Sequence, residues 1–109
     1  LDVNREIAAA LNGSSGPVFL GPRLEFGYLA FHLPSPVHYP VYWQPGTSFD
    51  RGELPALLRS WQQQRFSTVL LYKDDHTYLP MSMLDALSTS FLLDDRFPHI
   101  SVYRRRPGF

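Results

Sequence analysis

The sequence predicts an α/β fold, a three-layer Rossmann-like sandwich with a parallel sheet and a C-terminal hairpin. Residues 67–72 form a short uncharged run rich in apolar, β-branched and aromatic side chains, which is typical of a strand buried on both faces. Helical patterns precede and follow this run, and alternating helices and strands favour a parallel sheet. Two further apolar runs, 91–93 and 100–104, are separated by a polar loop of hairpin length.

A first helix is expected over residues 3–11. Asp2 can cap its amino end, and Ile7 and Ala10 fall on one stripe that would pack on a sheet. Residues 12–16 then indicate a helix stop and a turn, because a phosphate-binding loop normally follows a strand and opens a helix. The other expected elements are strands over 17–20, 37–43, 67–72, 91–93 and 100–104 and helices over 23–31, 52–64 and 80–88.

The expected strand order depends on Pro40. Proline cannot donate a ladder hydrogen bond, so the strand over 37–43 is expected at an edge of the sheet. Right-handed crossovers then favour a parallel sheet in the order 2-1-3, with the first strand between the second and the third. The C-terminal hairpin is expected to extend the sheet beyond the third strand.

Length and composition predict one domain, residues 1–109, with 44% hydrophobic residues and enough aromatic side chains for a packed core. The formal net charge of zero gives no overall attraction for nucleic acid. The absence of cysteine excludes disulfides, thiolate zinc sites and a cysteine nucleophile. The chain has no initiating Met, signal peptide or apolar run long enough to span a bilayer, so a domain cut from a larger protein is expected.

A ligand site is expected where the parallel strands end, because ligands of open α/β sheets lie outside the carboxyl ends of the strands. The polar stretches expected to meet there are 21–25, 44–48 and 73–78. The candidate ligand-binding residues are Arg23, Glu25, Lys73, Asp74 and His76. The cations can donate to a phosphate or a sugar, and the carboxylates can accept from sugar hydroxyls. The same residues would otherwise form an ordinary solvated surface.

The sequence gives less support to metal binding, to catalysis and to a lipid contact. The run 74–76 offers metal-ligand types, but neighbours in one loop rarely all point at one ion, so no metal and no cofactor is expected. Ser48, His76 and Asp74 provide the residue types of a serine triad without a nucleophile elbow, so no catalytic residue is expected. The arginines at 104–106 could contact phosphates or anionic lipid headgroups, or form a solvated end.

Five segments together resemble a known layout. They are VFLG at 18–21, EFGYLAF at 25–31, PVYW at 40–43, FSTVLLY at 66–72 and ISVYR at 100–104. This layout resembles the soluble C-terminal extracytoplasmic domain of bacterial polytopic glycosyltransferases of the dolichyl-phosphate-mannose–protein mannosyltransferase type. In that family the membrane portion carries the catalysis and a polyprenyl-phosphate sugar is the donor.

The resemblance implies a non-catalytic accessory domain on the extracytoplasmic face of the bacterial cytoplasmic membrane. Its expected partners are the membrane-embedded part of the parent protein and a glycan or polyprenyl-phosphate sugar, with no nucleic acid. Two other classes stay open: a small-molecule-binding Rossmann-like domain, although Gly21 lacks the spaced glycines of a dinucleotide fingerprint, and a protein-interaction module using Tyr39, Trp43 and Phe49.

Overall fold

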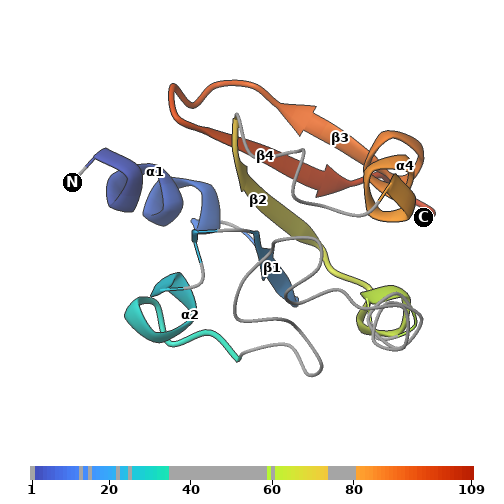
Figure 1. Cartoon of the computed structure of the whole chain (residues 1–109), viewed down its shortest axis with the longest axis horizontal. Coiled ribbons are helices and arrows are strands. Elements are labelled where there is room, and N and C mark those ends of the chain that lie inside the picture. The colour runs from blue at the N-terminus through green and yellow to red at the C-terminus, as the bar shows by residue number, and fades with distance from the viewer. Residues whose placement is uncertain are drawn as a thin grey trace.

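The computed structural model describes residues 2–12, 14, 16–21, 23–24, 26–34, 59, 61–73 and 81–109 (Figure 1). Within these residues the strands form one four-stranded sheet in the order β1-β2-β4-β3. The strands are β1 (Val18–Leu20), β2 (Thr68–Tyr72), β3 (Phe91–Asp94) and β4 (Ile100–Arg105). The helices are α1 (Asp2–Leu11), α2 (Phe26–Ala30) and α4 (Met81–Ser90), and residues 61–64 form a further helical turn.

The sheet is mixed. β1 and β2 pair in parallel, with Leu20 opposite Leu70. β4 pairs antiparallel with β2 on one side and with β3 on the other, placing Leu70 opposite Val102 and Leu92 opposite Arg104. Most pairings between the described strands are therefore antiparallel.

The predicted Rossmann-like parallel sheet in the order 2-1-3 is wrong. β1 does neighbour β2, but the other neighbour of β2 is β4, which runs in the opposite direction. The predicted strand over 37–43, on which the order depended, lies outside the described residues. The C-terminal hairpin is present as β3 and β4.

Burial explains why the second strand of the hairpin, and not the first, lies beside β2. Ile100, Ser101 and Val102 are all buried, and because successive side chains of a strand point to opposite faces, β4 needs cover on both faces. In β3 the side chains of Leu92 and Leu93 are about half exposed. β3 therefore takes the edge position of the described sheet and β4 the interior one.

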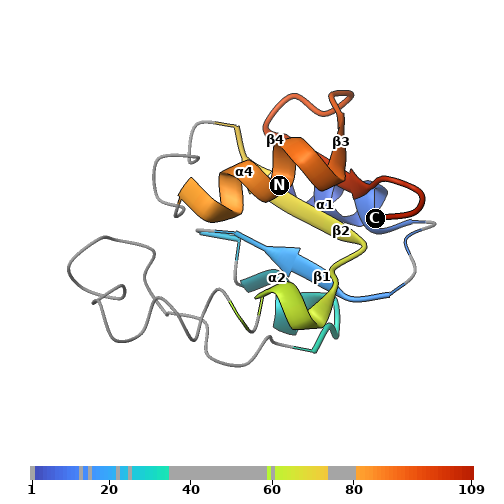
Figure 2. The same cartoon turned by 90° about the vertical axis from the view of Figure 1, so that its right-hand side faces the viewer.

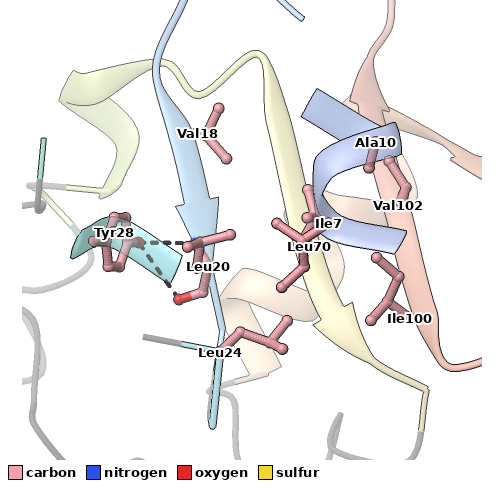
Figure 3. Close-up of a cluster of buried hydrophobic side chains, with 9 residues drawn as sticks. All are labelled: Ile7, Ala10, Val18, Leu20, Leu24, Tyr28, Leu70, Ile100 and Val102. Carbon is pink, nitrogen blue, oxygen red and sulfur yellow. Dashed lines mark hydrogen bonds between the residues drawn. The ribbon is translucent and has the colours of Figure 1, made fainter. Parts of the chain in front are cut away.

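Helices cover both faces of the sheet (Figures 1 and 2). α1 and α2 lie on one face, where the core consists of Ile7, Ala10, Val18, Leu20, Leu24, Tyr28, Leu70, Ile100 and Val102 (Figure 3). α4 and the helical turn lie on the other, where the core consists of Phe19, Trp61, Phe66, Val69, Leu71, Met83, Leu87 and Phe91. The alternation of Val69, Leu70 and Leu71 between these cores makes β2 the shared centre of the fold.

Tyr28 fixes α2 against β1. The main-chain N–H of Leu20 donates to the Tyr28 hydroxyl at 2.8 Å, and the same hydroxyl donates to the Leu20 carbonyl at 3.4 Å (Figure 3). Gly27 permits this approach, because a Cβ there would stand only 2.7 Å from Cδ1 of Leu20. The helix can therefore pack closely on the end of the strand.

Candidate functional site

The carboxyl ends of β1 and β2 lie together, as predicted for adjacent parallel strands. The main-chain N–H of Gly21 donates to the carbonyl of Leu70 at 2.9 Å, so the chain leaves β1 close beside β2. Arg23 follows β1 and Lys73 follows β2. The predicted site residues Glu25, Asp74 and His76 lie outside the described residues.

Arg23 contacts the end of β2 through Tyr72. The guanidinium carbon of Arg23 lies 4.5 Å from the centroid of the Tyr72 ring, which is the geometry of a cation–π contact. Arg23 has a φ of 66°, and the turn is closed by a hydrogen bond from the N–H of Leu24 to the carbonyl of Gly21. This left-handed conformation is uncommon outside glycine, and it accompanies the placement of the guanidinium on the neighbouring strand.

Lys73 connects the end of β2 to the loop between β3 and β4. Its ammonium lies 3.2 Å from a carboxylate oxygen of Asp95, and its main-chain N–H donates to the carbonyl of His99. Both side chains of the ion pair are well exposed, 36% for Lys73 and 68% for Asp95, so the pair contributes about 0–1 kcal/mol. A polar ligand could exchange with either partner at little cost. We call Arg23, Tyr72, Lys73 and Asp95 the β1–β2 rim.

Glu6 and His99 form a second polar contact at this end of the sheet. One carboxylate oxygen of Glu6 accepts from the main-chain N–H groups of His99 and Ile100, at 2.8 and 3.3 Å, and the other contacts Nδ1 of the His99 ring. Burial alone would raise the pKa of Glu6, but the hydrogen bonds and the His99 ring together lower it below its ordinary value. Glu6 is thereby committed to holding α1 against the start of β4.

Asp94 is held in a similar way. Arg96 donates to both of its carboxylate oxygens, at 2.8 and 2.7 Å, and Nε of Arg104 lies 3.5 Å away. The hydrogen bond from Arg96, opposed by burial and assisted by both positive charges, lowers the pKa of Asp94 to about 2. A carboxylate that stays ionised through the neutral range can anchor the hairpin loop, but it is a poor proton donor near pH 7.

Tyr72, Asp95, Glu6 and Asp94 were not among the predicted site residues. Tyr72 belongs to the apolar strand, and Asp95 to the hairpin loop, so local patterns assigned them structural roles. Glu6 lies next to Ile7 on a helix whose apolar stripe predicts a buried face. A carboxylate near such a face needs a hydrogen-bond partner, and this was the signal in the sequence. The identity of that partner had no local signal.

The described residues contain neither a metal-binding cluster nor a membrane-spanning helix. No group of three or more histidine, cysteine, aspartate or glutamate side chains in this part of the chain is arranged to hold a metal ion. Among the same residues, no helix has the length and apolar character needed to cross a membrane. Comparisons with protein-family models, with curated proteins and with solved structures find no match to this chain.

Proposed function

We propose that this chain is a non-catalytic accessory domain of a bacterial membrane glycosyltransferase that uses a polyprenyl-phosphate sugar donor. The resemblance of its strand and helix layout to the extracytoplasmic domain of such enzymes supports this proposal. The domain would act on the extracytoplasmic face of the membrane. There it would contact the sugar donor or the acceptor glycan, or support the membrane-embedded part of the parent protein.

The observations that carry the ligand-binding part of the proposal are the contact of Arg23 with Tyr72 and the Lys73–Asp95 pair, both at the carboxyl end of β2. Guanidinium and ammonium groups donate hydrogen bonds to phosphate and sugar oxygens, and a carboxylate accepts them from sugar hydroxyls. These groups lie at the carboxyl ends of two adjacent parallel strands, the usual position of ligands in α/β sheets. The β1–β2 rim thus combines the chemistry and the position expected for a polar ligand.

Two described carboxylates at this end, Glu6 and Asp94, are placed for structural support and not for proton transfer. Glu6 accepts hydrogen bonds from two main-chain N–H groups, and Asp94 is held by two arginines. Both carboxylates are therefore committed to anchoring the loop between β3 and β4. A general base must instead be able to exchange a proton near the working pH.

Chemical-shift mapping by NMR tests this function. The ¹⁵N-labelled chain is titrated with a short-chain polyprenyl-phosphate mannose and separately with acceptor glycans or peptides. We expect shifts to cluster on the amides of residues 21, 23–24, 72–73, 95–97 and 99, and Lys73→Gln to weaken binding. Arg5→Gln is the matched control, because it removes one exposed positive charge on α1. No shifts at millimolar ligand, or shifts only at the opposite end of the sheet, would contradict the ligand-binding part of the proposal and leave support of the membrane-embedded part.

A protein-interaction module is the second candidate function, favoured by β3. This strand lies at the edge of the described sheet, and its Leu92 and Leu93 side chains are 52% and 51% exposed. Edge strands with exposed apolar side chains are suited to pairing with a peptide strand. In the acceptor-peptide titration this function predicts shifts on residues 91–94, with no response at the β1–β2 rim.

The described sheet does not have the strand pairing of a Rossmann-like small-molecule domain. Ligands of that fold bind where the order of parallel strands reverses. In the described sheet the neighbour of β2 opposite β1 is the antiparallel β4, so the strand pairing on which that class rests is not the one observed.

A further inference from the structure

The outer edge of β3 presents main-chain hydrogen-bonding groups at defined positions. In an antiparallel pair of strands, residues that exchange hydrogen bonds with the neighbour alternate with residues whose N–H and C=O groups point away from it. The main-chain N–H of Arg106 donates to the carbonyl of Ser90, so the even-numbered residues of β3 face β4. The N–H and C=O groups of Phe91 and Leu93 therefore point away from β4.

Leu93 offers both a donor and an acceptor on this edge. The carbonyl of Phe91 already accepts from Nε of Arg106 at 3.3 Å, and Phe91 directly follows the last residue of α4. The half-exposed side chains of Leu92 and Leu93 lie on opposite faces of the sheet, because successive side chains of a strand alternate. A strand that pairs here gains two main-chain hydrogen bonds at Leu93 and an apolar neighbour on each face.

The sequence of β3 does not contain the residues that commonly keep an edge strand from pairing. Natural edges are often blocked by a lysine, a proline or an inward-pointing charge. β3 has the sequence FLLD, in which the acid stands last. This acid, Asp94, is already paired with Arg96 and Arg104. The first three residues of the strand thus bring only apolar side chains to the edge.

We propose that β3 pairs with β3 of a second copy of this chain, antiparallel and about a two-fold axis beside Leu93. In this register the two Leu93 residues exchange both main-chain hydrogen bonds, and Phe91 of each copy lies opposite Asp95 of the other. The described sheets of the two copies then form one continuous sheet. This inference rests on the second candidate function, whose partner it names, and it does not depend on the β1–β2 rim.

Charge complementarity favours a second copy as the partner. The outer edge of β3 carries a cation at its first residue, because Nε of Arg106 contacts the outward carbonyl of Phe91. Asp95 follows the other end of the strand, and its 68% exposed carboxylate belongs to the weak surface pair with Lys73. The register places Asp95 of each copy opposite Phe91, and therefore beside Arg106, of the other. Two-fold symmetry forms this contact twice, once at each end of the paired strands.

The contact is small, so the dimer is weak and depends on protein concentration. Stable complexes bury roughly 1,200–2,000 Å² of surface, which is more than two strands of four residues supply. The main-chain hydrogen bonds and the paired charges fix the register instead of a large apolar area. We therefore expect a dissociation constant between the high micromolar and the millimolar range.

Sedimentation equilibrium of the full chain, at concentrations up to about 1 mM, tests the pairing. We expect wild type to change from monomer to dimer as the concentration rises, and the amide resonance of Leu93 to shift in parallel. Leu93→Lys places two like charges across the axis and should raise the dissociation constant at least about tenfold. Leu29→Lys is the matched control, because it changes an exposed leucine on α2 and should leave dimerisation unchanged.

An exchange of charges tests the register. Asp95→Arg and Arg106→Glu each place like charges at both ends of the paired strands, and each should weaken the dimer about fivefold. The double variant restores opposite charges, keeps the net charge of wild type and should recover most of the affinity. Asp95 is exposed and Arg106 lies just beyond β4, so these variants should fold, which their amide spectra check.

Three results would overturn the inference: a monomer at every concentration, a dimer that Leu93→Lys does not weaken, or a double variant that is no stronger than the single ones. A monomer whose residues 91–94 respond to an acceptor peptide would overturn self-pairing and support the second candidate function with a peptide as partner. The response of the β1–β2 rim to a sugar phosphate is measured separately. The rim and the β3 pairing can therefore each fail alone.

Discussion

Glu6 and His99 join α1 to the start of β4 across 93 positions of the chain, with Oε2 of the carboxylate 2.5 Å from Nδ1 of the ring. The other carboxylate oxygen accepts from the main-chain N–H of His99 at 2.8 Å. Glu6 is buried on a helix that otherwise packs on the sheet through apolar residues. This one carboxylate therefore satisfies main-chain donors that would otherwise be left unpaired where β4 begins.

Replacing Glu6 should destabilise the protein. We expect Glu6→Ala to lower the free energy of unfolding by about 2–3 kcal/mol, because the buried N–H of Ile100 and the partly buried N–H of His99 lose a charged acceptor. Glu6→Gln should cost less, since an amide oxygen still accepts. Urea unfolding measures both. Asp85→Ala, at an exposed acid on α4, is the control and should change stability by less than about 0.5 kcal/mol. Equal stabilities of Glu6→Ala and wild type would contradict the assigned contact.

The pH dependence of stability should contain a contribution from Asp94. Its hydrogen bond with Arg96 lowers the pKa of Asp94 from 3.8 to about 2, so in this range the unfolded chain binds a proton more readily than the folded one. The stabilisation is complete above the unfolded pKa and is lost as the pH falls through about 2. We expect urea midpoints to drop across this interval in wild type. Asp94→Asn should flatten the drop, whereas Asp95→Asn should largely preserve it.

Leu70 should be among the most sensitive apolar positions. Its side chain is fully buried in β2 within the core that contains Ile7, Leu20 and Val102. Leu70→Ala should lower the free energy of unfolding by about 2–5 kcal/mol, through lost apolar burial and the cavity left behind. Leu92→Ala removes the same atoms from a half-exposed edge position and should cost less than about 1 kcal/mol. A denaturant midpoint unchanged by Leu70→Ala would refute the central place of β2.

Gly27 should resist replacement by alanine although it lies in a helix. In an exposed helix the change would stabilise by about 1 kcal/mol. Here the added Cβ would lie 2.7 Å from Cδ1 of Leu20, a buried side chain with little room to move. We expect a net loss of about 1–2 kcal/mol, because overpacking outweighs propensity. Leu29→Ala, at an 85% exposed position on the same helix, is the control for α2. Increased thermal stability of Gly27→Ala would show that the Leu20 side chain can move to make room for the added methyl group.

Local sequence patterns alone were sufficient to predict several helices and strands. The uncharged run that ends at Tyr72, the apolar stripe through Ile7 and Ala10 and the two runs of the hairpin all correspond to elements observed within the described residues. Each depends on side chains within a few residues of one another, so helical or strand spacing in the sequence is enough to reveal them. The meeting of Arg23 with the end of β2 was also predictable, because adjacent parallel strands end at the same edge.

Within the described residues, the sequence by itself therefore determined the strands β1 to β4, the helix α1 and the apolar stripe that α1 buries. Only the tertiary structure decided that β4 lies beside β2 and that Glu6 holds His99. These relationships join residues far apart in the chain, and each competes with many alternative pairings of similar local energy. The observed pairings are favoured because they bury both faces of β4 while the buried polar groups keep hydrogen-bond partners. This balance is a property of the whole fold.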